Sequence, residues 1–136
     1  GPNEPTLSFH GSKYTSKYIS LTAAEIRDND DKPLDKISAS DTKLFTSLGG
    51  GYPFLDIGGK YYFGVQFDPS VLGGSSKTQA QVADALSDPS TDIAKAAVGS
   101  ANILTAAICE TTNQQPANVC TSKGVVAAKS KLNVTS

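Results

Sequence analysis

Two cysteines, Cys109 and Cys120, are the residues in this chain whose chemistry is easiest to define. Cys109 ends an alanine-rich apolar stretch, and Cys120 follows a polar loop at residues 111–118. A catalytic pair usually has the spacing Cys-x-x-Cys at a helix start, whereas Cys109 is expected at a helix end, where the dipole disfavours a thiolate. We therefore predict a structural disulfide in an oxidising compartment, with two free thiols or a regulatory switch as the alternatives.

His10 is the only histidine, so a Ser-His-Asp or Cys-His catalytic device would depend on it. It lies in a segment rich in Ser and Gly near the N-terminus, which is typical of a surface histidine. One histidine and two oxidised cysteines also argue against a histidine-based zinc site. We predict that the chain as given has no catalytic residue, no metal site and no cofactor.

The acidic run at residues 28–31 resembles the start of a calcium-binding loop. An EF-hand loop then needs Gly at its sixth place and Glu at its twelfth, where this chain has Pro33 and Ala39. The run therefore predicts a solvated turn, with a looser cation site as the alternative. Glycine clusters at residues 49–51, 58–59 and 73–74 match no phosphate-binding loop and predict turns.

The chain has 136 residues, of which 38% are apolar and 18% charged, and a formal net charge of −1. So small a charge has no long-range attraction for nucleic acid or anionic lipid, and we predict no nucleic-acid partner. The chain has no run of about eighteen apolar residues, so the sequence predicts no membrane span. The opening Gly1-Pro2 is typical of a protease scar on an excised part of a longer protein. We expect a scar and flexible N-terminus at residues 1–5, one domain at residues 6–132 and a frayed tail at residues 133–136.

The clearest local pattern predicts a β-hairpin, with strands at residues 52–57 and 60–67 around a Gly58-Gly59 turn. Weaker alternation predicts strands at residues 6–9 and 18–22. Apolar spacing and capping signals predict four helices, at residues 38–48, 78–86, 89–109 and 124–132. Together these elements predict an α+β fold, with a small mixed β-sheet, a central hairpin and C-terminal helices.

Capping residues and one apolar stripe position the predicted helices. The expected N-caps are Ser40, Thr78 in a capping box with Gln81, and Asp88 before Pro89. The expected buried stripe of the longest helix consists of Ile93, Ala97, Ala101, Leu104 and Ile108.

Pro53 stands at the start of the predicted hairpin, a place where a strand tolerates proline. Three tyrosines lie nearby, at Tyr52, Tyr61 and Tyr62. They could line a surface for a carbohydrate or a peptide, and packing within the sheet and core would explain them equally well.

Six blocks in consistent order resemble the domain-of-unknown-function 929 family, at residues 14–20, 52–61, 67–74, 85–90, 101–109 and 116–120. That family is uncharacterised, prokaryotic, typically membrane-anchored with an extracytoplasmic domain, and similar to thioredoxin-like proteins. The resemblance implies the later part of a thioredoxin-like fold, in which a cis-proline precedes a strand and presents backbone groups to an extended substrate. It also implies that Tyr52 and Pro53 border a substrate groove and that Cys109 pairs with Cys120.

The family's Cys-x-x-Cys motif would precede Thr6 and is not in this chain. The resemblance therefore implies an extracytoplasmic thioredoxin-like domain, related to thiol–disulfide exchange but without its own catalytic motif. The alternative is a non-enzymatic binding or cell-surface module. In either case we expect a peptide or protein partner and a homo-oligomer, formed by pairing or swapping of exposed strands.

Overall fold

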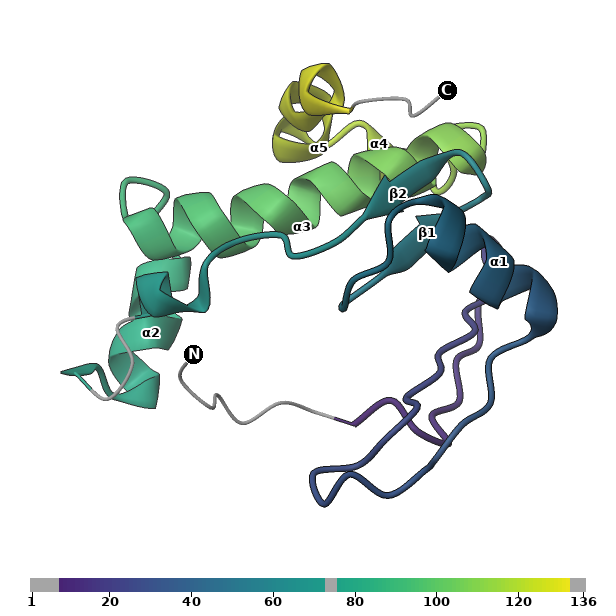
Figure 1. The fold of residues 1–136 in the computed structure, drawn as a ribbon. Helices are drawn as coiled ribbons and strands as arrows, with labels where there is room; N and C mark the ends of the chain where they lie inside the picture. The colour runs from purple at the N-terminus through teal and green to yellow at the C-terminus, as the bar shows by residue number, and fades with distance from the viewer. Residues whose placement is uncertain (1–7, 73–75, 133–136) are drawn as a thin grey trace. The chain divides into compact units, whose positions relative to one another are not determined.

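The described residues form an α+β fold, as predicted, in a computed structural model that covers residues 8–72 and 76–132. The ends predicted at residues 1–5 and 133–136, the first half of the strand predicted at residues 6–9 and the Gly73-Gly74 turn lie outside this part. The chain divides into two compact units, Pro5–Gly51 and Tyr52–Ser136, which are called the N-terminal unit and the C-terminal unit below (Figure 1). The assignment of residues 6–132 to one domain stays a prediction.

In the N-terminal unit the described part holds one helix, α1 (Ala39–Ser47). Ser38, and not Ser40, is its N-cap, because the Ser38 hydroxyl accepts a hydrogen bond from the Asp41 backbone N–H. The prediction of a strand at residues 18–22 is wrong, since these residues pair with no other strand in the described part. Their backbone alternates weakly in the sequence, but a strand exists only where a neighbouring strand exchanges hydrogen bonds with it.

The C-terminal unit begins with the hairpin, in which β1 (Leu55–Ile57) runs antiparallel to β2 (Tyr61–Phe63) (Figure 1). The hairpin is confirmed, but its strands are shorter than predicted. Lys60 belongs to the turn rather than to β2, because its backbone N–H donates to the Ile57 carbonyl at 3.3 Å. Gly58 and Gly59 have φ angles of +66° and +65°, a left-handed conformation that glycine adopts without steric cost.

The elements after the hairpin are helical: η1 (Pro69–Leu72), α2 (Gln79–Leu86), α3 (Asp92–Thr111), α4 (Ala117–Cys120), α5 (Lys123–Ala128) and η3 (Lys129–Lys131). The predicted capping box of Thr78 and Gln81 is confirmed at the start of α2. The last predicted helix is confirmed as α5 followed by η3. Helix α4 was not predicted, because a four-residue helix is too short to show apolar periodicity.

The start of α3 differs from the prediction by three residues. Asp88 is not its N-cap, because the Asp88 carboxylate accepts from the Ser90 backbone N–H in a turn. Thr91 caps α3 instead, through a bond from the Ala94 backbone N–H to its hydroxyl oxygen. The same hydroxyl donates to the Ala85 carbonyl at 2.7 Å and thereby joins the end of α2 to the start of α3.

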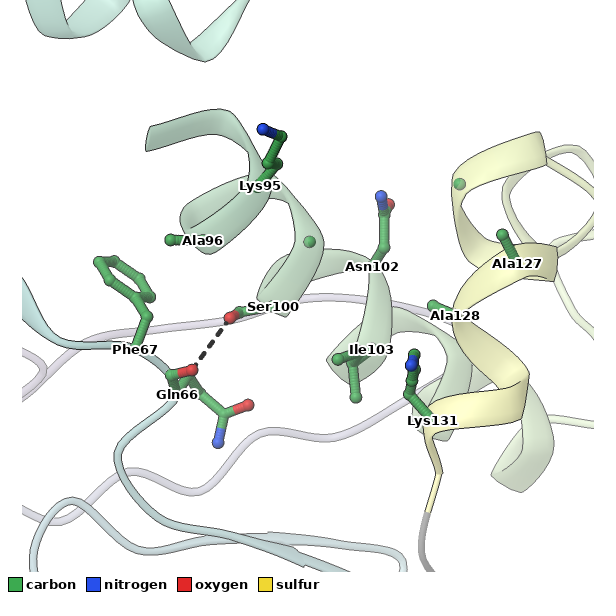
Figure 2. Close-up of a pocket in the computed structure, with 12 residues that line it drawn as sticks. Gln66, Phe67, Lys95, Ala96, Ser100, Asn102, Ile103, Ala127, Ala128 and Lys131 are labelled. Atoms are coloured by element: carbon green, nitrogen blue, oxygen red, sulfur yellow. Dashed lines mark hydrogen bonds between the residues drawn. The ribbon is translucent and has the colours of Figure 1, made fainter. Parts of the chain in front are cut away.

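Helix α3 is the element on which the rest of the C-terminal unit packs, with α2, α5 and β1 all in contact with it. The segment after β2 is also tied to α3, since the Ser100 hydroxyl donates to the Gln66 carbonyl (Figure 2). By length and composition α3 could cross a membrane, with a mean hydropathy of 1.2. One such helix is weak evidence for a membrane span, because the core helix of a soluble protein passes the same test of length and composition; 28% of the apolar window of α3 is buried.

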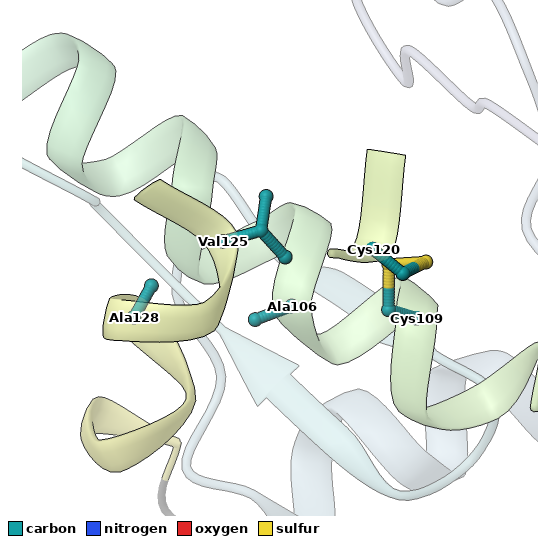
Figure 3. Close-up of a cluster of buried hydrophobic side chains, with 5 residues drawn as sticks. All are labelled: Ala106, Cys109, Cys120, Val125 and Ala128. Atoms are coloured by element: carbon teal, nitrogen blue, oxygen red, sulfur yellow. A yellow bond between two sulfur atoms is a disulfide. The ribbon is translucent and has the colours of Figure 1, made fainter. Parts of the chain in front are cut away.

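The core of the C-terminal unit consists of two small clusters on α3. The first joins α3 to α4 and α5 and contains Ala106, Cys109, Cys120, Val125 and Ala128 (Figure 3). The second joins α3 to the hairpin and contains Ile57, Tyr61 and Ala107. The predicted stripe of α3 is right at Ile93, which is buried, and at Leu104 and Ile108, which pack against the second cluster. It is wrong at Ala101, which is exposed. The small alanines at the two contacts let neighbouring elements approach closely.

Candidate functional site

Cys109 and Cys120 form a disulfide bond, which confirms the predicted pairing. Their Cα atoms are 5.6 Å apart, and each residue is only 1% exposed. These two are the only cysteines of the chain, and both lie inside the first core cluster. Neither sulfur of a disulfide is a thiolate that could attack a substrate, and burial keeps an outside thiolate from reaching either sulfur. The position of the bond therefore favours a structural role. The bond is also compatible with an oxidising environment.

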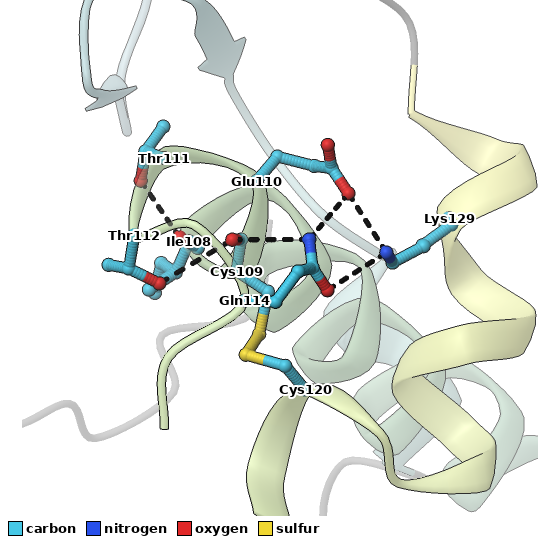
Figure 4. A network of polar contacts seen from close by, with 8 residues as sticks. All are labelled: Ile108, Cys109, Glu110, Thr111, Thr112, Gln114, Cys120 and Lys129. Carbon is cyan, nitrogen blue, oxygen red and sulfur yellow. Dashed lines mark hydrogen bonds and ion pairs between the residues drawn. A yellow bond between two sulfur atoms is a disulfide. The ribbon is translucent and has the colours of Figure 1, made fainter. Parts of the chain in front are cut away.

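The backbone next to Cys109 is held by the loop that follows α3. The Cys109 carbonyl accepts hydrogen bonds from the Gln114 backbone N–H at 2.8 Å and from the Gln114 side chain at 3.3 Å (Figure 4). Asn113 and Gln114 have φ angles of +54° and +61°. These left-handed residues end α3 and turn the chain back toward α4, and the Gln114 bonds satisfy a carbonyl that the helix end leaves open.

An ion pair fastens η3 to the end of α3. The Lys129 ammonium lies 3.0 Å from the Glu110 carboxylate and donates to the Gln114 side-chain oxygen at 2.9 Å (Figure 4). The hydrogen bond from Lys129 holds the pKa of the Glu110 carboxyl below its ordinary value. Lys129 also places a positive charge near the negative end of the α3 dipole. The network therefore supports the disulfide region and contains no group poised for catalysis.

The residues predicted to border a substrate groove, Tyr52 and Pro53, lie at the entry to the hairpin. Tyr52 is 64% exposed, Pro53 is exposed, and the peptide bond between them is cis. The other two tyrosines differ in their surroundings. Tyr61 is buried in the second core cluster, and Tyr62 is half-buried with its ring stacked on Phe54 at 6.2 Å between centroids. A surface for a ligand at the hairpin could therefore use Tyr52 and Tyr62, but not Tyr61.

His10 is an exposed residue of the N-terminal unit, as predicted. Its Nδ1 lies 2.8 Å from the Asp35 carboxylate, and this hydrogen bond lowers the pKa of Asp35. The Ser8 hydroxyl donates to Glu25 at 2.6 Å rather than to the imidazole, and this bond lowers the pKa of Glu25. The serine and the imidazole thus have separate carboxylate partners, and the arrangement is not a catalytic relay.

The acidic residues of the turn at residues 28–31 have partners within the turn. The Asp28 carboxylate accepts hydrogen bonds from the backbone N–H groups of Asp30 and Lys32, and the Lys32 ammonium lies 3.0 Å from Asp30. Among the described residues no three His, Cys, Asp or Glu side chains converge as metal ligands. The contacts are those of a solvated turn.

A groove of about 560 Å³, which the sequence analysis missed, lies between α3 and the α5–η3 segment (Figure 2). Lys95, Gly99, Asn102 and Ile103 of α3 line one side, and Lys131 of η3 lines the other. The four α3 residues have steps of four, three and one, so they share one face of the helix. That spacing was the available signal, but only the apolar stripe was considered in the prediction.

Comparisons of the chain with protein-family models, with curated protein sequences and with solved structures each returned no match. The resemblance to the domain-of-unknown-function 929 family therefore stays a prediction that depends on the sequence blocks described above.

Proposed function

We propose that this chain is the polypeptide-binding domain of an extracytoplasmic thioredoxin-like protein, and that it binds its partner without exchanging its own disulfide. The observation that carries the second half of this proposal is the burial of Cys109 and Cys120, each 1% exposed within one disulfide. A disulfide that exchanges must offer one sulfur to an attacking thiolate. The location outside the cytoplasm is proposed because such bonds form and persist in oxidising compartments.

The hairpin supports binding of an extended segment. In the described part the sheet has only the two strands β1 and β2, so each has a neighbour on one side alone. The outer edge of such a strand presents backbone N–H and C=O groups that can pair with another extended chain. Tyr52 lies three residues before the start of β1 and adds an exposed ring, which could pack on side chains of the bound segment.

We propose an apolar, extended stretch of protein as the partner. The resemblance to thioredoxin-like proteins supports this choice, since it implies that Tyr52 and Pro53 border a groove for a substrate strand. In a longer protein with a Cys-x-x-Cys motif, that segment would be held for thiol–disulfide exchange by the other cysteines. The same open strand edges could pair with a second copy of this chain, and we propose a homo-oligomer on that basis.

The binding site can be mapped by nuclear magnetic resonance on the isotopically labelled chain. The probe is ribonuclease A whose thiols have been reduced and carboxymethylated, which keeps it unfolded and unable to exchange disulfides. We expect shift changes at residues 52–57. Tyr52→Ala should weaken binding about threefold to tenfold, as the loss of one aromatic contact predicts.

Val126→Ala is the matched control, because Val126 is 51% exposed and lies on α5, outside the hairpin. It should leave the affinity unchanged. Shift changes confined to other parts of the chain, or equal weakening by both variants, would contradict the proposed site.

Sedimentation velocity tests the proposed homo-oligomer separately. The mean sedimentation coefficient should rise with protein concentration, because pairing between the strand edges of two chains is an association equilibrium that higher concentration shifts toward the dimer. A single monomer species at every concentration would refute self-association and would leave the peptide-binding proposal to its own titration.

A further inference from the structure

We propose that the groove between α3 and the α5–η3 segment binds a small organic carboxylate with an apolar body. This site is separate from the hairpin entry, since neither Tyr52 nor Pro53 lines it. Its volume of about 560 Å³ is in the range of small-molecule sites in proteins. The proposal does not depend on the function proposed for the hairpin.

Charge selects the class of ligand. Lys95 lines the groove from α3 and Lys131 lines it from η3, while none of the twelve lining residues is acidic (Figure 2). Lys95 has one distant partner, the Asp92 carboxylate at 3.5 Å, and both of these side chains are exposed. Lys131 has no ion-pair partner in the part of the chain that the structure describes. Two lysines and no acidic residue give the lining of the groove a positive charge, which favours an anion as the ligand.

A polar group in the lining of the groove favours a carboxylate over a bare anion. Asn102 is half-buried on the same wall as Lys95, and its side-chain amide has no hydrogen-bond partner among the described residues (Figure 2). An amide N–H₂ can donate to one carboxylate oxygen while an ammonium binds the other. The Asn102 amide is partly exposed and is therefore accessible to a ligand that enters the groove.

The apolar part of the groove favours a ligand with an apolar body. Phe67, Ile103 and Ala128 line it together with small residues. Gly99 leaves its middle open, because a Cβ added there would meet no heavy atom within 4 Å. A chain or ring attached to the carboxylate would cover this apolar surface and gain from its removal from water.

The test uses a matched pair of probes, 4-phenylbutyrate and its uncharged amide, in titrations of the isotopically labelled chain followed by nuclear magnetic resonance. The carboxylate should shift the backbone signals of α3 around Gly99 and those of η3. The amide should bind about tenfold more weakly, since it cannot form an ion pair with either lysine, and added salt should reduce that difference. Equal affinities for the two probes, or no shift change at the groove, would overturn the proposal.

Two variants locate the site. Lys131→Gln should weaken 4-phenylbutyrate about threefold to fivefold, whereas Lys123→Gln, on α5 but outside the groove, should have no effect. Gly99→Leu should fill the groove and reduce the affinity of both probes at least tenfold, while the circular dichroism spectrum stays unchanged. Should Gly99→Leu disturb the fold, the two lysine variants decide alone: equal effects from Lys131→Gln and Lys123→Gln would overturn the site.

Discussion

The packing of the hairpin turn against the end of α3 can be tested by replacing Gly58 with alanine. A Cβ added at Gly58 would lie 2.6 Å from Thr111 Cγ2 and 3.2 Å from Thr111 Cβ. Gly59 is a natural control, because its φ of +65° is nearly that of Gly58, +66°, but its added Cβ would meet no heavy atom within 4 Å. The two alanine substitutions therefore share the cost of the backbone conformation and differ in their contact with α3.

The expected losses follow from these two contributions. Alanine in the left-handed conformation costs about 1–2 kcal/mol, which is the whole expected loss in free energy of unfolding for Gly59→Ala. Gly58→Ala adds an overpacking cost of about 1–3 kcal/mol, for a total of about 2–5 kcal/mol. Thr111 cannot easily relieve the clash, because its Cβ is fixed to the helix and its hydroxyl donates to the Ile108 carbonyl at 2.8 Å.

Urea unfolding followed by circular dichroism measures both losses. Adding Thr111→Ser to Gly58→Ala removes the closest atom, Cγ2, and keeps the hydroxyl. This double variant should recover about 1 kcal/mol or more relative to Gly58→Ala, with the same change having little effect in the wild-type chain. Losses that agree within about 0.5 kcal/mol for the two glycine variants would refute the packing of the turn on α3.

Three further predictions concern the end of α3 and its middle. Replacing Cys109 and Cys120 together by alanine should lower the free energy of unfolding by about 3 kcal/mol, the loop-closure value for a separation of 11 residues, and thermal unfolding with a reductant should show the same loss in the wild-type chain. Because the pKa of Glu110 is lowered in the fold, its contribution to stability is present above the ordinary value of 4.5 and is lost as the pH falls below it. Lys129→Met should therefore flatten the fall in melting temperature between about pH 5 and pH 3. The change should be equivalent to less than about 1 kcal/mol, because the side chains of Lys129 and Glu110 are both partly exposed. A pH profile of the melting temperature that Lys129→Met leaves unchanged would contradict this. Gly99→Ala should raise the free energy of unfolding by about 0.5–1 kcal/mol in urea unfolding, because the methyl group enters open space and alanine is the better helix former; a loss would show that the space is occupied.

The elements that were predicted correctly are those whose signals are local. The capping box of Thr78 and Gln81 satisfies its own hydrogen bonds within four residues, and the hairpin is closed by two glycines that allow a left-handed turn. The start of α3 was misplaced because Asp88 and Thr91 are both good N-caps. Contact with α2 favours Thr91, whose hydroxyl also donates to the Ala85 carbonyl. Nothing within the α3 segment alone contains that information.

The strand predicted at residues 18–22 is absent because its formation would depend on a distant partner rather than on a local signal. A strand is stabilised by a partner that can be far away in the chain, and alternation of side chains over five residues does not reveal whether that partner exists. The described part of the N-terminal unit has a single isolated bridge, between Arg27 and Pro33. Its largest side chains are mostly exposed, including Phe9, Tyr14 and Leu21.

The disulfide and the groove differ in the same way, since one has a local signal in the sequence and the other depends on contacts between distant elements. The disulfide was predictable because two cysteines in a chain leave one possible pair, and a helix end makes a poor place for a thiolate. The groove was not predictable from the sequence, because it depends on how α5 crosses α3. There Gly124 approaches Asn102 so closely that an added Cβ would lie 2.6 Å from its side-chain nitrogen. Lys131 and Lys95 line the same groove only as a result of that crossing.

The size of the buried side chains explains why the disulfide matters for this fold. Among the described residues, the largest that are fully buried are Cys109 and Cys120 themselves, and the residues around them are Ala106, Val125 and Ala128. Such small side chains remove little apolar surface from water, so the cluster contributes few of the roughly 5–15 kcal/mol that a domain needs. A cross-link worth about 3 kcal/mol is then a large share of the total. It follows that a reducing compartment would weaken the packing of α4 and α5 on α3, which is a physical reason to expect this chain to work where its disulfide persists.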